Sequence, residues 1–152
     1  MRIVIPRAPS LFGVTDCRLS LALDEMAKIA SAHDVVEIQV DNSYRPKAHL
    51  PGKRSKSQHA YGLAADVTRM RLRDGTTLRV EEDWHATIGS VSCGPDAVMS
   101  GPTPASIALR DIVCEIAQRG IFHHILSPSY DEAHRDHLHL DIARDASRQA
   151  MH

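Results

Sequence analysis

The sequence predicts an α+β fold in which a mainly antiparallel sheet is flanked by helices. Two segments, 17–31 and 106–119, repeat apolar residues at the three- and four-residue steps of an amphipathic helix. Short β-branched segments occur elsewhere, and the pair Asp74-Gly75 separates two of them as in a hairpin turn. Strands grouped in hairpins together with a few helices are typical of this class.

The bulk composition indicates one folded domain. The chain has 152 residues, of which 43% are apolar and 24% charged, as in ordinary globular proteins. We therefore expect a single domain over residues 1–152, with its core from about 15 to 144. A net charge of -1 and only 4% aromatic residues argue against nucleic-acid binding. Membrane insertion is not expected, because no apolar run approaches the ~20 residues that a spanning helix needs.

The first half of the chain is expected to begin with a helix at 17–31, which either Thr15 or Asp16 caps. A β-branched strand follows at 35–40. The segment 47–56 contains proline, glycine and four basic residues, and predicts an exposed loop.

Strands at 64–71 and 76–80 are expected on either side of the hairpin turn. A short helix at 81–88 and a loop at 92–104, rich in glycine, proline and serine, are expected next.

The clearest helix is expected at 106–119. Thr103 suits its N-cap, Pro104 its first turn and Gly120 its C-terminal stop. Strands at 121–126 and 138–143 complete the predicted fold, and the polar tail beyond is expected to be frayed.

The three cysteines leave at least one thiol unpaired, and none lies in a CxxC motif, so they do not predict a structural zinc site. One disulfide of unspecified pairing and buried free thiols are equal alternatives for Cys17, Cys93 and Cys114.

Two histidine-rich segments far apart in the chain predict a metal site. The first holds His59 and, seven residues later, Asp66; the second holds His137 and His139, which face the same side of a predicted strand. Three protein ligands plus a water are the pattern of a catalytic zinc site. We expect His59, Asp66 and one of His137 and His139 as the ligands, which points to metal-assisted hydrolysis.

Hydrolysis at such a metal also needs a base. Asp136, three residues before His139, is the best-placed carboxylate, and His134 and His137 are expected to assist or orient it. Asp141 continues the same strand face and is a candidate hydrogen-bond acceptor for a ligand.

The ordered motifs resemble the extensin-like C-terminal domain family, which is related to the zinc D,D-peptidases of the peptidase M15 and LAS type. The resemblance covers about residues 17–143. It rests on Asn42-Ser43-Tyr44-Arg45, Lys53 through Ala60, Asp74-Gly75-Thr76, Asp83-Trp84, and Ser127 through Asp141.

This resemblance implies an LAS/M15 fold of the hedgehog and D,D-peptidase kind and one Zn²⁺ per chain. It implies hydrolysis of peptidoglycan stem peptides or D-Ala cross-links, by an endopeptidase or a carboxypeptidase. The alternative is a non-catalytic, zinc-stabilised module that binds cell-wall peptides. The implied metal ligands are His59, Asp66 and His139; the implied catalytic residues are Asp136, His134, His137 and Arg45; the implied substrate-binding residues are Arg45 and Ser57.

Two departures from the family pattern stand out. Tyr44 precedes Arg45 where the family often has cysteine, so a disulfide partner for Cys17 is missing. Asp136 stands where many M15 enzymes use glutamate, and the shorter side chain shifts the work toward His134 or His137.

The resemblance also implies action in the periplasm or cell wall. The apolar stretch at residues 1–7 is too short for a signal peptide. Retention in the cytoplasm, a removed leader and signal-independent export are the alternatives. The last of these suits a phage-type lysin or an antibacterial effector, with an immunity protein or a secretion-system component as partner.

Overall fold

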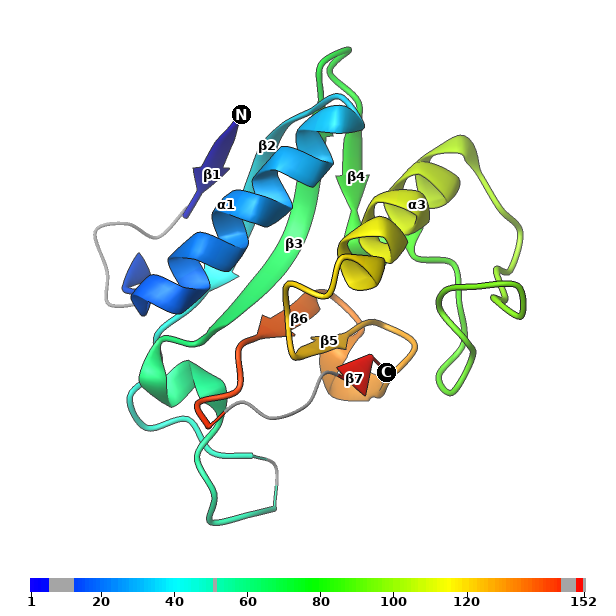
Figure 1. Cartoon of the computed structure of the whole chain (residues 1–152). Helices are drawn as coiled ribbons and strands as arrows, with labels where there is room; N and C mark the ends of the chain where they lie inside the picture. Colours follow the sequence, from blue (N-terminus) through cyan, green and yellow to red (C-terminus); the bar gives the residue numbers. More distant parts are fainter. Residues whose placement is uncertain (6–12, 51, 146–149, 152) are drawn as a thin grey trace.

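The computed structural model describes residues 1–5, 13–50, 52–145 and 150–151. Within them, a seven-stranded mixed sheet is covered on one face by two long helices (Figure 1). The predicted α+β class is therefore confirmed. The helices flank only one face of the sheet, and the other face is free to carry polar side chains.

A long central strand, β3, organises the sheet. One edge of β3 pairs antiparallel with β2, and its other edge is shared between β6 and β4. The strand β5 pairs antiparallel with β6 and extends the sheet on that side. The bounds of these strands are β2 (Val35–Asn42), β3 (Ala64–Leu72), β4 (Thr77–Arg79), β5 (His124–Leu126) and β6 (Leu138–Asp141).

The two outermost strands were not expected from the sequence. The strand β1 (Arg2–Val4) pairs parallel with β2, and β7 (Ala150–Met151) pairs parallel with β5. Strands of three and two residues are too short to show the alternation of apolar and polar residues that predicts a strand. The prediction of a frayed tail is wrong for Ala150–Met151, while residues 146–149 lie outside the described residues.

Both long helices begin with a capped first turn, as their sequences predict. In α1 (Cys17–Ala32), the Asp16 carboxylate accepts a hydrogen bond from the Arg18 amide at 2.9 Å, so Asp16 rather than Thr15 is the cap. In α3 (Pro104–Gln118), Thr103 and Ser106 form a reciprocal capping box. The apolar stripes of both helices belong to the core cluster that covers the sheet.

Some helix and strand boundaries differ from the predicted ones by a few residues. The helix α2 (Val80–Asp83) is shorter than the predicted 81–88, because His85 has a positive φ of 51° that a helix cannot contain. The strand expected at 121–126 begins only at His124. The predicted loop at 92–104 is confirmed up to Thr103, because Pro104 already begins α3.

A disulfide joins this loop to α3. Cys93 bonds to Cys114, while Cys17 is an exposed free thiol. The alternative of three buried free thiols is therefore wrong, and the missing partner for Cys17 agrees with the altered residue before Arg45.

The disulfide should stabilise the fold measurably. Replacing both Cys93 and Cys114 with serine should lower the free energy of unfolding by about 3 kcal/mol, because a link across 21 residues restricts the unfolded chain. Urea unfolding of the oxidised protein and the variant measures this difference. Cys17→Ser is the matched control and should unfold like the wild type. Equal stability of all three proteins would contradict a structural role.

Candidate metal centre

Three side chains from three elements converge on the face of the sheet opposite the helices. His59 lies in η2 (Gln58–Tyr61), Asp66 in β3 and His139 in β6, and all three are buried. His59 Nε2 lies 3.0 Å from Asp66 Oδ1 and 3.2 Å from His139 Nδ1. His139 Nδ1 lies 3.1 Å from the same Asp66 oxygen. The three atoms form an almost equilateral triangle.

Strand alternation places two of these residues. Leu138 and Leu140 of β6 belong to the core beneath the helices, so His139 and Asp141 face the other side. Asp66 is paired directly opposite His139 across the β3–β6 ladder. The cross-strand distance in such a pair brings the two side chains into contact.

Local hydrogen bonds position His59. Ser57 caps η2 and accepts a hydrogen bond from the His59 amide at 3.3 Å. The His59 carbonyl accepts from the Arg45 amide at 2.9 Å. On the ring, Nδ1 lies 2.8 Å from the Ser43 carbonyl oxygen, which can only accept, so Nδ1 carries the proton. In the neutral ring, Nε2 then presents its lone pair to the triangle.

A carboxylate positions His139 in the same way. Its Nε2 lies 3.3 Å from Asp141 Oδ2, so this nitrogen donates and Nδ1 faces the triangle. The other Asp141 oxygen is 2.8 Å from His124 Nδ1. Asp141 thus lies where an acceptor for a ligand was predicted, and His124 holds it from behind.

The triangle is a site for positive charge. Two imidazole lone pairs and a carboxylate face one another, and such donors repel unless a cation or proton lies between them. Burial raises the pKa of Asp66, but hydrogen bonds from His139 and His59 outweigh it and hold that pKa far below its usual value. Burial lowers the pKa of His139, but hydrogen bonds to Asp141 and Asp66 outweigh it and raise the pKa to about 9. In the metal-free protein, a proton on His139 therefore supplies the charge.

The donor set fits a small divalent metal. Bonds of ~2.0–2.1 Å in a tetrahedron separate the ligand atoms by about 3.3 Å. The observed separations of 3.0–3.2 Å are close to that edge. Calcium fits poorly, since it takes six or more oxygen ligands at longer distances. His59, Asp66 and His139 could therefore hold a metal of the zinc type.

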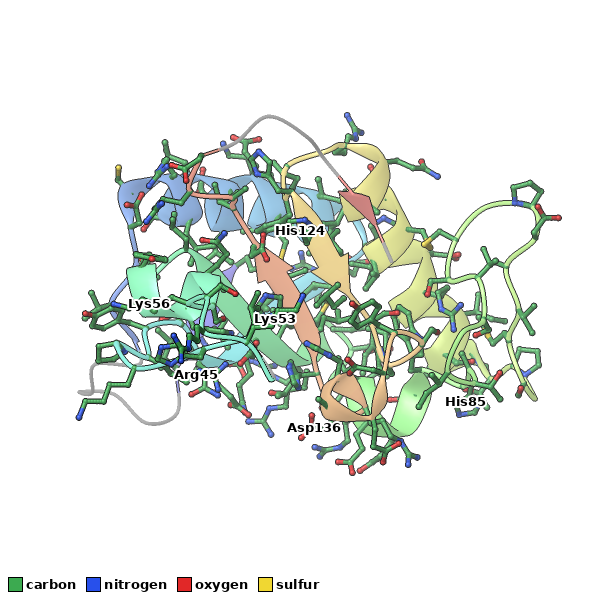
Figure 2. The ribbon with its side chains drawn as sticks, turned by 90° about the horizontal axis from the view of Figure 1, so that it is seen from below. Arg45, Lys53, Lys56, His85, His124 and Asp136 are labelled. Atoms are coloured by element: carbon green, nitrogen blue, oxygen red, sulfur yellow. A yellow bond between two sulfur atoms is a disulfide. The ribbon has the colours of Figure 1, made fainter. Side chains whose placement is uncertain are left out.

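The triangle lies in the wall of a cavity of about 670 Å³. Arg45 also reaches the centre, with Nη2 3.8 Å from Asp66 Oδ2. Figure 2 shows Arg45 and Asp136 on the side of the sheet away from the helices. The structure thus brings together at one cavity every site residue predicted from the sequence: Arg45, Ser57, His59, Asp66, His134, Asp136, His137 and His139.

Two aspartate–histidine pairs border the triangle. His137 Nδ1 lies 2.6 Å from Asp136 Oδ1, and its Nε2 lies 3.5 Å from Asp66 Oδ1. His134, at the end of η3 (Glu132–His134), has Nδ1 2.6 Å from Asp131 Oδ1. Burial lowers the pKa of His134 and outweighs its bond to Asp131. Within the first pair, it is therefore the His137 ring that contacts the triangle, and Asp136 lies behind that ring.

Asp131 was not singled out from the sequence. The signal was present, because a carboxylate three residues before a histidine meets it within one helical turn. Asp131 lies just before the histidine-rich segment, outside the pattern from which the site was predicted.

A family model for the extensin-like protein C-terminus matches residues 16–151, and the chain belongs to this family. Neither the curated proteins nor the solved structures contain a significant match to the chain. In the part of the chain that the structure describes, no helix is both long enough and apolar enough to cross a membrane.

The pKa of His139 is directly testable. In the metal-free protein, its imidazole should titrate near pH 9, measured by NMR, and Asp141→Asn should lower that pKa by removing a negative acceptor. Because the folded pKa exceeds the unfolded value, the associated stabilisation is present below pH ~6.5 and is lost as the pH rises through 9.

Asp131→Asn is the control, since it removes the acid partner of His134 and leaves both partners of His139 in place. A His139 ring that titrates near its ordinary value in the wild type would contradict the charge balance described for the triangle.

Proposed function

We propose that this protein is a zinc-dependent peptidase that hydrolyses peptidoglycan stem peptides or their D-Ala cross-links. The observation that carries the proposal is the triangle of His59, Asp66 and His139 in the wall of an open cavity. The motif resemblance to the M15 and LAS enzymes supports the substrate class.

When bound, zinc supplies a Lewis acid and lowers the pKa of a coordinated water toward ~7. The proton of the attacking water goes to His137, because Asp136 occupies Nδ1 of that ring and leaves Nε2 directed toward Asp66. Asp136 also stabilises the imidazolium that forms. This assigns His137 as the base and Asp136 as its positioning residue, a refinement of the expectation that Asp136 itself is the base.

Arg45 and His134 act on the substrate in this proposal. Arg45 offers a rigid fork of donors, which suits the negative charge that develops on the carbonyl oxygen. His137 returns to the leaving amine the proton that it took from the water, while His134, whose Nδ1 is held by Asp131, presents Nε2 as an acceptor that orients this amine. The ring centroids of His134 and His137 are 5.2 Å apart, close enough for both to serve one substrate.

Two further observations favour this reading. The Cys93–Cys114 disulfide is typical of proteins in oxidising compartments, and peptidoglycan lies outside the cytoplasmic membrane. The Asp136–His137 pair beside the triangle favours catalysis over a module that only binds cell-wall peptides, since binding alone requires no oriented base.

The proposal separates metal ligands from proton-transfer groups. His59→Ala and Asp66→Ala should lose both zinc and activity, because each removes one corner of the triangle. His137→Ala should keep about one zinc per chain yet lose turnover by roughly 10²–10⁴-fold, the usual contribution of a general base. Elemental analysis gives the zinc content, and mass spectrometry of digested sacculi gives the activity.

His33→Ala is the matched control, because it also removes a histidine with a carboxylate partner, Glu115, far from the cavity. A fully active His59→Ala protein would overturn the proposal. Zinc-loaded wild type that binds sacculus peptides without cleaving them, and does so unchanged in His137→Ala, would instead establish the binding module.

A further inference from the structure

The segment between Asp41 and Asp66 is uniformly basic. It contains no acidic residue, and its charged side chains are Arg45, Lys47, Lys53, Arg54 and Lys56. The sequence alone suggests an ordinary solvated loop. The structure divides these residues, because Arg45 and Lys53 line the cavity that holds the triangle and the other three do not.

Backbone hydrogen bonds hold the loop against the centre. The Leu50 amide donates to the Ser55 carbonyl at 3.0 Å, and His49 forms a β-bridge with Lys56. The Ser57 amide donates to the Ala48 carbonyl at 3.1 Å, and Ser57 in turn caps the turn that carries His59. The position of the loop is therefore coupled to that of a metal-ligand candidate.

Lys53 is a cavity-lining cation whose charge is not balanced by a neighbouring side chain in the part of the chain that the structure describes. Among the described residues it has no ion-pair partner, whereas Arg45 faces Asp66 and Lys56 lies over the Tyr61 ring. In Figure 2, Lys53 lies over the strands in the middle of the view, whereas Lys56 lies further to the left, away from these strands. An ammonium group without a protein partner at a cavity wall is available to an anionic ligand.

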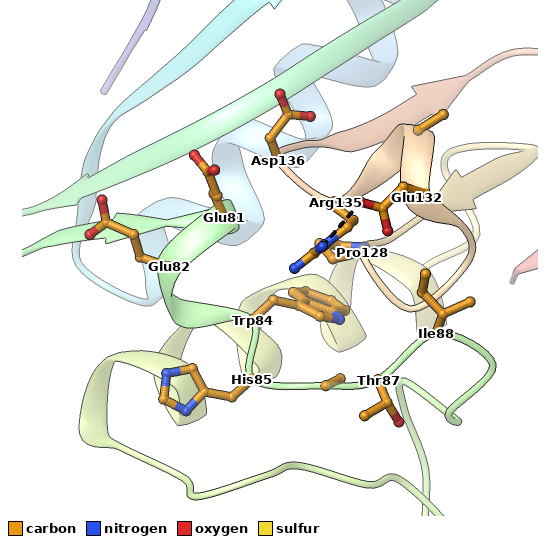
Figure 3. A pocket seen from close by; sticks show the side chains of 12 residues that line it. Glu81, Glu82, Trp84, His85, Thr87, Ile88, Pro128, Glu132, Arg135 and Asp136 are labelled. Atoms are coloured by element: carbon orange, nitrogen blue, oxygen red, sulfur yellow. Dashed lines mark hydrogen bonds and ion pairs between the residues drawn. The ribbon is translucent and has the colours of Figure 1, made fainter.

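Carboxylates line the same cavity beside His134 and His137. They belong to Asp131 and Asp136, and Asp136 also lines an adjoining groove of about 800 Å³. Figure 3 shows Glu81 and Glu82 among the residues that line that groove, while Glu132 is paired with Arg135. These carboxylates disfavour a substrate carboxylate beside them, whereas the basic loop attracts one.

We propose that Lys53 forms a subsite for the free C-terminal carboxylate of the substrate peptide, beside the Arg45 that faces the scissile carbonyl, and that Lys53 determines this specificity. The inference rests on the proposed function and narrows it. The preferred substrate is a peptide that ends shortly after the scissile bond, so the enzyme is a carboxypeptidase rather than an endopeptidase.

The experiment compares a peptide ending in D-Ala-D-Ala with the same peptide as its C-terminal amide. Calorimetric titration of the metal-free protein measures binding without turnover. The wild type should bind the free acid about tenfold more tightly than the amide, as one charge-assisted hydrogen bond allows at a partly exposed site. Lys53→Gln should remove this preference without changing the affinity for the amide. In the zinc-loaded protein, it should raise KM for the acid and leave kcat unchanged.

Lys47→Gln is the matched control, since it makes the same charge change in the same loop outside the cavity. Equal binding of acid and amide by the wild type, no binding of either, a preference that survives Lys53→Gln, or an equal loss in Lys47→Gln would each overturn the subsite. Selective binding of the acid without hydrolysis by zinc-loaded protein would leave the subsite standing and remove the proposed peptidase activity.

Discussion

The register between β3 and β6 is the constraint on which the site depends. It sets Asp66 opposite His139 on the polar face of the sheet while Leu138 and Leu140 enter the core. A shift of one residue would reverse every side chain of β6, burying imidazole against the helices and exposing leucine. The hydrophobic core therefore enforces the geometry of the centre. Of the three candidate ligands, it does not place His59, which the capped turn of η2 supplies.

Hydrogen bonds on the outer side of the candidate ligands complete this arrangement. The Ser43 carbonyl and the Asp141 carboxylate each occupy the outer nitrogen of one imidazole, which directs the inner nitrogens at one another. The same device recurs at the border, where aspartates hold one nitrogen of His134 and of His137. One nitrogen of each of the four rings is thus engaged by an acceptor, so the candidate ligands and the proposed proton carriers differ by position rather than by chemistry.

Much of this was accessible from the sequence, within physical limits. The pattern His137-x-His139 predicted a shared face, but alternation alone does not choose between two residues on that face. The choice depends on where pairing starts: β6 begins at Leu138, which leaves His137 just beyond the ladder. Other features depend on which distant segments meet in the folded chain, and local sequence does not contain that information. They are the pairing of Cys93 with Cys114 and the short edge strands β1 and β7.

The central claim is that the triangle is a metal centre with nitrogen and oxygen ligands. X-ray absorption at the zinc edge, recorded on zinc-loaded protein, tests it most directly. The account predicts a first shell of two imidazole nitrogens together with oxygen, at ~2.0–2.1 Å and without sulfur. A sulfur shell near ~2.3 Å, as from Cys17, or a shell of oxygen alone would contradict it.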